Sequence, residues 1–389
     1  MKPKLRFKAD DGSDFPDWKK KKLGEICEYG RRRGIGAHYI GTENMLKDFG
    51  GIAINDPEAE ASGSLYFKGD TLMSNIRPYL KKAWKANCDG ACSTDVLIFH
   101  PTNVESDYLY CMIASDSFVA YVMNAAKGSK MPRGDKAYIM QMPLILPSLP
   151  EQRKIADLLS TVDRVIAEQR SEVDAWEQRK KGVMQKLFSQ EVRFKADDGS
   201  DFPDWNEKTL GELTNLFVGK SFTSQLSENG HYVVMDMGSV SPDGSIIDTK
   251  LTDSTRDLLD KDDLIMPKDD IGGGLIIGKT AYIPCDGKYV CGDHVYRLRF
   301  GKGVDGLFMH YDINSTGPQK RLARKVTGSA QLGLNSKNVS SETISIPSLS
   351  EQRKIANCLS SIDDVIAKEK AELAKWQELK KGLLQQMFV

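Results

Sequence analysis

The chain has 389 residues and a balanced charge, with 54 basic and 54 acidic side chains, so a nucleic-acid surface would need its basic residues gathered on one face. No apolar run is long enough for a membrane span, and the start of the chain lacks the apolar core of a signal peptide. The 7 cysteines include no CxxC pair, which favours a reduced, cytoplasmic protein without a disulfide or zinc framework.

An opening block at residues 6–18 reads RFKADDGSDFPDW, and the same block recurs unchanged at residues 193–205. LGEI follows the first copy at 23–26, and LGEL follows the second at 210–213. Repetition on this scale indicates two copies of one architecture. Because Phe, Pro and Trp recur at fixed spacing, the blocks are interpreted as ordered, turn-rich lead-ins rather than flexible linkers.

The first variable region covers about 29–146. Its pattern predicts strands at 71–74, 96–99 and 139–146 and a helix at 108–124, separated by Gly, Asn and Asp turns. The second variable region covers about 217–346. It predicts strands at 232–236, 263–266, 275–283 and 294–300 and a helix near 307–314. Short strands with few helices indicate an α+β fold in each region.

Each variable region ends in a long helix, at 147–188 and again at 347–388. Ser148 and Glu151, like Ser348 and Glu351, form the pattern of a capping box. Apolar residues then step by four and three, as in a coiled coil. The two seams match position by position, with interruptions at Gln169 and Lys180 and at their counterparts Glu369 and Lys380. The predicted seam comprises Ile155, Leu159, Val162, Ile166, Val173 and Trp176, with Ile355, Leu359, Ile362, Ile366, Leu373 and Trp376.

The order of block, variable region and helix, repeated twice, predicts a pseudo-twofold internal repeat whose chain ends lie close together. Each helix leaves one globular region and heads toward the other, so the two helices are expected to run antiparallel and to act as a spacer of roughly 57 Å. The alternative is a pair of ordinary amphipathic core helices. The predicted domains are residues 1–147, the central helix 148–188, residues 189–347 and the C-terminal helix 348–389.

Two glycine motifs suggest nucleotide binding but lack the required context. GGLIIGKT at 273–280 fits the P-loop pattern, yet a strand and turn are predicted to follow it instead of a helix. GKGVDG at 301–306 fits a dinucleotide-binding pattern without a surrounding βαβ unit. The five histidines show no metal-ligand spacing. We therefore predict no catalytic residue, no metal and no cofactor.

The chain resembles the specificity subunit of type I restriction–modification systems over essentially its whole length. The resemblance rests on PSLPEQRKIA and PSLSEQRKIA at the helix starts, on the two lead-in blocks, and on the fragments YIGTENM, SNIRPYLKK and GSKMPRGD. It implies two target-recognition domains that each read half of a split DNA sequence, separated by the two helices. It also implies partners: double-stranded DNA, two methyltransferase subunits, and motor-nuclease subunits that join the complex. Catalysis then belongs to those partners.

Base edges are read best by Arg, Lys, Asn and Gln, and phosphates are bound by further basic residues. In the first domain the candidate DNA-binding residues are Arg31, Arg32, Arg33, Thr42, Asn44, Asn75, Arg77, Lys127, Lys130 and Arg133. In the second they are Lys220, Lys268, Arg321, Arg324, Lys325, Gln331, Asn335 and Lys337. For any one of these, a solvated surface charge is the alternative.

Two other functions are compatible with parts of the pattern. One is a P-loop NTPase built on GGLIIGKT. Binding of labelled ATP that is lost in Lys279→Ala would support it. The other is a scaffold that binds two protein copies and no DNA, which a DNA footprint with two protected segments would exclude. The leading hypothesis is a bipartite DNA-recognition subunit without catalysis.

Overall fold

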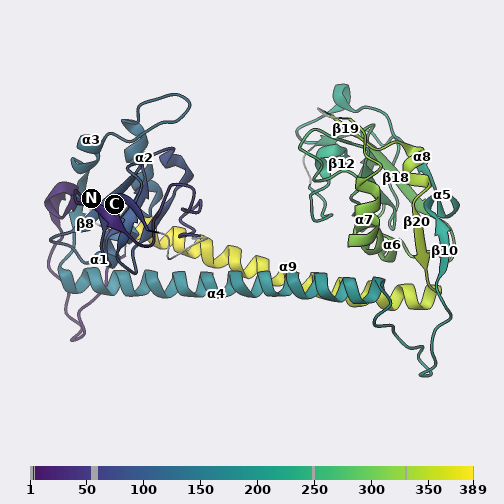
Figure 1. Cartoon of the computed structure of the whole chain (residues 1–389), viewed down its shortest axis with the longest axis horizontal. Helices are drawn as coiled ribbons and strands as arrows, with labels where there is room; N and C mark the ends of the chain where they lie inside the picture. The colour runs from purple at the N-terminus through teal and green to yellow at the C-terminus, as the bar shows by residue number, and fades with distance from the viewer. Residues whose placement is uncertain (1–2, 4, 54–59, 248–249, 329–330, 389) are drawn as a thin grey trace. The chain divides into compact units, whose positions relative to one another are not determined.

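The computed structural model describes residues 3, 5–53, 60–247, 250–328 and 331–388. It divides into two compact units (Figure 1). The first unit comprises Met1–Ser171 and Lys370–Val389, and the second comprises Glu172–Glu369. Each long helix therefore contributes residues to both units. Within the described ranges, no helix is long and apolar enough to cross a membrane.

The first unit is an α+β domain built on antiparallel strands. Its sheets have the orders β2-β8-β5-β6, β3-β4-β7 and β1-β9. The strands are β1 (Lys19–Lys22), β2 (Cys27–Tyr29), β3 (Arg33–Gly36), β4 (Ala61–Tyr66), β5 (Thr71–Ser74), β6 (Ala83–Lys85), β7 (Gly90–Cys92), β8 (Val96–Pro101) and β9 (Pro143–Leu146). The helices are η1 (Leu23–Glu25), η2 (Pro78–Leu80), α1 (Ser106–Ile113), α2 (Asp116–Asn124), α3 (Lys136–Met140) and the start of α4 (Leu149–Phe188).

The second unit repeats this plan, except that one strand pair, Tyr232–Met235 with Tyr289–Cys291, is parallel. Its sheets have the orders β11-β18-β14-β16, β13-β12-β17, β10-β20 and β15-β19. The strands are β10 (Asn206–Thr209), β11 (Thr214–Phe217), β12 (Tyr232–Met235), β13 (Leu251–Thr252), β14 (Leu264–Pro267), β15 (Asp269–Asp270), β16 (Ala281–Tyr282), β17 (Tyr289–Cys291), β18 (Val295–Phe300), β19 (Leu332–Gly333) and β20 (Thr343–Ile346). The helices are α5 (Leu210–Leu213), η3 (Thr223–Gln225), η4 (Met237–Ser239), α6 (Gly306–Asn314), α7 (Thr316–Ala323), α8 (Ser336–Ser340) and α9 (Leu349–Met387).

The central strands of each unit are apolar on both faces because helices and a second sheet cover them. All four residues of β5 are buried, as are those of β14. In the first unit Phe99 of β8 contacts Tyr29 and the edge of Phe118, which joins the sheet to α2. The predicted strands at 71–74, 96–99, 232–236, 263–266 and 294–300 are confirmed within a residue or two at their ends.

Three local predictions were wrong. The helix predicted at 108–124 is two helices, because the Ser115 hydroxyl accepts the N–H of Phe118 and starts α2 anew. The strand predicted at 139–146 begins with α3, which Asp135 caps, and only β9 is extended. The strand predicted at 275–283 is mostly a loop. Gly273, Gly274 and Gly278 all have positive φ there, so only β16 remains.

The two long helices begin at Leu149 and Leu349, directly after the predicted capping serines, and contact each other within both units. In the first unit Ile155 and Leu159 of α4 share a cluster with Leu383 and Met387 of α9. In the second unit Leu187 of α4 shares a cluster with Ile355 and Leu359 of α9. The start of one helix therefore packs on the end of the other, so the paired segments run antiparallel in each unit. A continuous coiled coil between these ends stays a prediction.

Candidate nucleic-acid interface

The lead-in block and the helix start are joined by an ion pair around a buried carboxylate, repeated in both units. The carboxylate of Glu151 is fully buried and accepts bonds from Arg6 Nε at 3.0 Å and Nη2 at 2.8 Å. The indole N–H of Trp18 donates to the same carboxylate at 3.0 Å. The buried Ser148 hydroxyl has no hydrogen-bond partner, so the capping box predicted for the first long helix does not form, and Glu151 binds the lead-in block instead. The hydrogen bond from Arg6 to Glu151 raises the pKa of the guanidinium.

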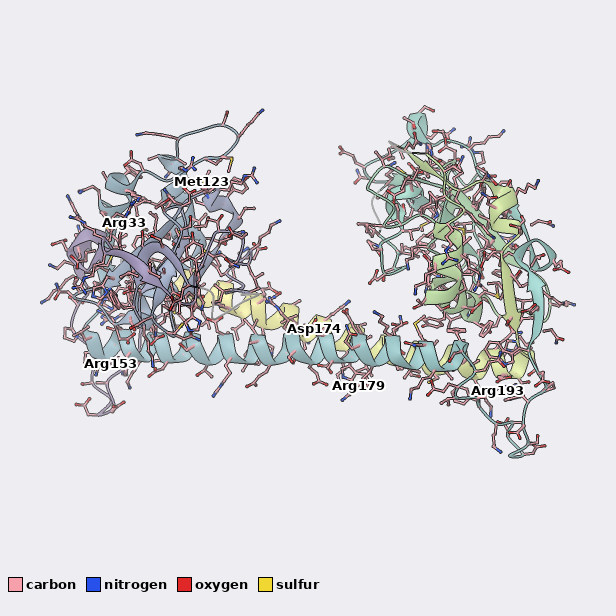
Figure 2. The ribbon with its side chains drawn as sticks, in the orientation of Figure 1. Arg33, Met123, Arg153, Asp174, Arg179 and Arg193 are labelled. Carbon is pink, nitrogen blue, oxygen red and sulfur yellow. The ribbon has the colours of Figure 1, made fainter. Side chains whose placement is uncertain are left out.

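The second copy reproduces this junction with the residues at the equivalent positions. Arg193 donates to Glu351 at 3.1 and 2.8 Å, and Trp205 donates at 3.2 Å. Figure 2 labels Arg193, which lies just beyond the end of α4. One part of the predicted capping box does form here, since the Ser348 hydroxyl accepts the Glu351 N–H at 3.4 Å. We call each Arg–Glu–Trp cluster the junction clamp.

The glutamine that follows each clamp glutamate fixes the helix start to the globular part of its unit. Gln152 accepts the N–H of Glu105, the N-cap of α1, at 2.9 Å and donates to the carbonyl of Pro147 at 2.9 Å. Gln352 does the same with Asp305, the N-cap of α6, and with Pro347. The Glu–Gln pair of each EQRKIA motif thus connects the start of the long helix to the lead-in block and to the N-cap of α1 or α6.

A further pair of matching contacts shows how the chain ends complete the repeat. The N–H of Val192 donates to the carbonyl of Lys186 at 3.2 Å, where α4 runs directly into the second lead-in block. The N–H of Leu5 donates to the carbonyl of Gln386 at 3.4 Å, although these residues lie at opposite ends of the sequence. The two chain ends therefore meet in the first unit. The equivalent position in the second unit is where the chain runs without a break from α4 into the lead-in block.

The lysines that interrupt the predicted seams pair with aspartates of the other helix. Lys180 of α4 lies 2.6 Å from Asp363 of α9 in the second unit, and Lys380 of α9 lies 2.5 Å from Asp163 of α4 in the first. Asp363 also accepts the hydroxyl of Tyr311 at 2.6 Å. Sliding one helix along the other would separate each lysine from its aspartate. The pairs therefore favour one alignment of the two helices.

Among the predicted seam residues, those near the helix starts are the most buried. Ile155, Leu159, Val162, Val173, Ile355, Leu359 and Ile366 are buried, whereas Ile166, Trp176, Ile362, Leu373 and Trp376 are half-buried. The guanidinium of Arg179 lies 4.8 Å from the ring centroid of Trp176. The seam therefore combines packing onto each globular part with packing between helices.

In the first unit the fold brings two of the predicted DNA-binding segments together. The N–H of Arg77 donates to the carbonyl of Pro132 at 2.8 Å, and Ile76 forms a bridge with Arg133. The stretch after β5 and the loop between α2 and α3 thus make one surface. Arg77 is exposed and adopts the left-handed conformation at φ 51°, a strained backbone for a residue with a side chain.

The candidate side chains on and near this surface differ in availability. Lys130 is exposed, whereas Lys127 pairs with Asp135 at 2.8 Å and Arg133 with Asp95 at 3.2 Å. Asn75 is buried at 7% exposure, with an unpartnered Oδ1 near Gly134. Its Oδ1 is therefore not available to a base edge in this conformation. Asn44 uses its amide within its own loop, accepting from Gly41 and donating to Ala53, and Thr42 is half-buried beside it.

The second unit has the corresponding surface. Strand β15 pairs with β19, and the N–H of Leu334 donates to the carbonyl of Lys268, so the segments after β14 and before α8 lie together. Gln331, next to β19, and Lys337, in α8, are exposed, as are Lys220 and Arg324 elsewhere in the unit. Asn335 is the N-cap of α8 and accepts the N–H of Asn338 at 2.8 Å.

Two second-unit candidates have a structural role that their sequence did not indicate. Arg321 and Lys325 both pair with Glu342, a carboxylate that is 1% exposed. Removing either cation would leave a buried charge partly uncompensated. We therefore remove Arg321 and Lys325 from the candidate DNA-contacting residues.

The P-loop-like segment does not form a phosphate cradle. Asp270 accepts the N–H groups of Gly272 and Ile276, so the loop closes on its own carboxylate, and strand β16 follows instead of a helix. Burial lowers the pKa of Lys279. Within the described part of the chain, no group of three or more His, Cys, Asp or Glu side chains is arranged to hold a metal ion.

Comparisons with known proteins agree with these repeats. A family model described as "Type I restriction modification DNA specificity domain" matches residues 16–173 and 203–376. The specificity subunit of the type I restriction enzyme MjaVIII from Methanocaldococcus jannaschii is 27% identical over 76% of this chain and 72% of its own length. The EcoDI specificity subunit of Escherichia coli is 30% identical over 23% of this chain and 20% of its own.

Two solved structures share the fold. The S subunit of a type I restriction–modification system from M. genitalium has a TM-score of 0.62 at 15% identity, covering 100% of this chain and 99% of that one. A chain from a study of complex assembly in a type I R-M system has a TM-score of 0.56 at 18% identity, covering 96% of this chain and 97% of that one.

Proposed function

Because the chain belongs to the family of type I restriction–modification DNA specificity domains, we propose that its two units each read one half of a split DNA target. The chain is a specificity subunit rather than an enzyme, and its role is recognition of DNA sequence. Each copy of the family domain covers the globular part of one unit and continues along the long helix that follows it.

One observation carries the proposal: the two units share identical junctions but differ in the loops that the junctions support. The junction clamps match atom for atom, with the same donors on Glu151 and Glu351. The paired loops differ, with Arg77, Lys130 and Arg133 in one unit and Lys268, Gln331 and Lys337 in the other. A constant frame that carries two different polar surfaces suits a protein that reads two different short sequences.

The chemistry of these loops fits the two kinds of contact that DNA offers. Lysine and arginine side chains bind phosphates without sequence preference, and this part of the affinity falls steeply with salt. Arginine and glutamine can also make paired hydrogen bonds to base edges in the major groove. We assign the phosphate role to exposed lysines such as Lys130 and Lys337, and base reading to Arg77 and Gln331.

The helices supply the unread gap between the two half-sites. An α-helix rises about 1.5 Å per residue, so the length of α4 and α9 limits the separation that they can fix. The ion pairs of Lys180 and Lys380 oppose slippage of one helix along the other. We propose that the gap in the target follows from this fixed alignment.

We further propose that one methyltransferase subunit docks at each copy of the helix and lead-in surface, and that motor-nuclease subunits join through the resulting complex. Gly182 and Gly382 occupy matching helix positions, and a Cβ at either would meet no atom of the described chain within 4 Å. Arginine at both positions should leave the chain folded but prevent copurification of the methyltransferase, whereas alanine should not. Unchanged copurification of the arginine variant would place the docking surface elsewhere.

A footprint on duplex DNA tests the split target. The complex of this chain with its methyltransferase should protect two short segments and leave an accessible gap between them. One continuous protected segment would contradict two separate readers. No protection at all would favour the alternative of a protein scaffold that does not bind DNA.

A further inference from the structure

The three-stranded sheet of the first unit narrows to two strands at one end. β7 pairs with β4 only over residues 64–66, so the pairing of residues 34–36 with 61–63 continues beyond it as a two-stranded ribbon. Strand β3 lies at the edge and pairs antiparallel with β4, with Arg33 opposite Ser64 and Ile35 opposite Ser62. Directly opposed residues in such a pair project from the same face. Arg33, Ile35, Ser62 and Ser64 therefore form one compact group of side chains at this edge (Arg33 is labelled in Figure 2).

The fold does not account for the exposure of Ile35. Its side chain is 72% exposed, although a bare apolar residue on an edge strand invites aggregation. The glycines beside it are explained by packing: a Cβ on Gly34 would lie 3.0 Å from Leu65, and one on Gly36 would lie 3.0 Å from the backbone of Gly90. These glycines fix which face of the strand turns inward, and Ile35 is left on the outward face.

Three arginines lie just before Ile35 in the chain. Arg31, Arg32 and Arg33 are all exposed, and only Gly34 separates them from Ile35. Arg33 projects from the same face of the strand as Ile35. Within the described residues no ion pair is formed by Arg31 or Arg33, and the guanidinium of Arg32 lies 5.6 Å from the ring centroid of Phe67. A polyanion that presents an apolar group within its charged surface would match this combination.

We propose that the β3–β4 ribbon enters the major groove of the first half-site, where Ile35 contacts the 5-methyl group of a thymine. This inference rests on the proposed function. The major groove is about 12 Å wide and admits a two-stranded ribbon. The thymine methyl is the apolar group that the groove offers, guanine presents two acceptors that suit Arg33, and serine hydroxyls can bond to any base.

The test removes the methyl group from the DNA and its partner from the protein. Adenine-methylation mapping of plasmid DNA from cells that express this chain with its methyltransferase supplies the target. Duplexes carrying that target are then made with each half-site thymine replaced in turn by deoxyuridine, which lacks only the 5-methyl group. Affinities are measured for the complex with the wild-type chain and with the Ile35→Ala chain. Ile271→Ala, which alters another exposed isoleucine in the second unit, is the matched control.

We expect one thymine at which deoxyuridine weakens binding of the wild-type complex about fourfold, equivalent to about 0.8 kcal/mol for one buried methyl group. The Ile35→Ala complex should bind the thymine and deoxyuridine duplexes equally at that position. The Ile271→Ala complex should keep the wild-type difference there.

Equal deoxyuridine sensitivity in the wild-type and Ile35→Ala complexes would overturn the inference, as would no sensitivity in either. Loss of methyltransferase copurification by Ile35→Ala, without a change in deoxyuridine sensitivity, would show that the ribbon binds protein instead. Failure of the wild-type complex to bind DNA or to methylate a split target would overturn the proposed function itself, which separates the two outcomes.

Discussion

The junction clamp of the first unit gives the sharpest prediction from a single residue. Glu151→Gln keeps the shape of the side chain but removes the charge that Arg6 and Trp18 share. We expect the lead-in block to lose about 3 kcal/mol of attachment, at the low end of the range for breaking a buried ion pair. The low end applies because the Arg6 side chain is 26% exposed, so solvent can replace part of the lost interaction.

A loss of that size raises the population of detached lead-in roughly a hundredfold, since about 1.4 kcal/mol corresponds to a factor of ten. Limited trypsin digestion reports this population when opening is fast relative to cleavage. Cleavage after Lys8 should accelerate by about that factor and leave a nearly full-length chain. The matched variant Glu351→Gln should instead accelerate cleavage after Lys195 and split the chain into two large fragments.

An unchanged rate of cleavage after Lys8 in Glu151→Gln would show that Glu151 does not hold the first lead-in block. If Glu351→Gln accelerated cleavage in the first lead-in block as much as in its own, the effect of each glutamate would not be confined to the block that it contacts. A variant that changed neither site but lowered overall stability would place the glutamate in the core of its unit rather than at the junction.

Three further predictions concern the two long helices, the buried Asp312 of the second unit, and the loop of the first unit that contains Lys127 and Lys130. Gly182→Ala and Gly382→Ala should each raise the free energy of unfolding in urea by about 1 kcal/mol, and a decrease would reveal packing against the helix at that position. Burial raises the pKa of Asp312 from the ordinary 3.8 to about 7, so the folded state loses stability as pH rises from about 4 to 7. Asp312→Asn should therefore stabilise the second unit by about 2–4 kcal/mol at pH 8 and by little at pH 4, and an equal effect at both would contradict the shift. Lys130→Ala should reduce the salt dependence of DNA binding by about one phosphate contact. Lys127→Ala should reduce it less, because Lys127 is already paired with Asp135. Equal salt dependence of binding for the wild-type chain and both variants would show that this loop does not contact DNA.

The repeat and the two long helices could be predicted because their signals are local and strong. The identical blocks at 6–18 and 193–205 required one architecture twice, and the seam positions recur at the same steps. The central strands of both units were also predictable. β8 and β14 carry runs of apolar residues that are typical of a covered sheet.

The failures have specific causes. Leu275, Ile276 and Ile277 are strand formers, but Gly273, Gly274 and Gly278 impose positive φ on the segment and turn it into a loop. A single hydrogen bond from the Phe118 N–H to Ser115 breaks a run that is otherwise typical of one helix.

The candidate site was predictable as segments but not as side chains. Its two loops in the first unit were both identified, yet nothing in the sequence shows that Arg77 bonds to Pro132 or that Asn75 is buried. The junction clamp joins residues 145 positions apart and was missed. The recurrence of Arg, Trp and Glu at matching positions of both copies was the available signal.

The account rests on two separate readers held apart by the helices, and one measurement tests this most directly. Adenine methylation is mapped for the wild-type chain and for a variant with one extra heptad in each helix, inserted after Ser171 and after Ala371. A heptad adds about 10.5 Å, the length of about three base pairs. The account predicts a motif of two specified parts in both maps, with the same letters and a gap widened by up to about three base pairs in the variant. Methylation of the same motif with an unchanged gap, or of a single uninterrupted motif, would contradict it.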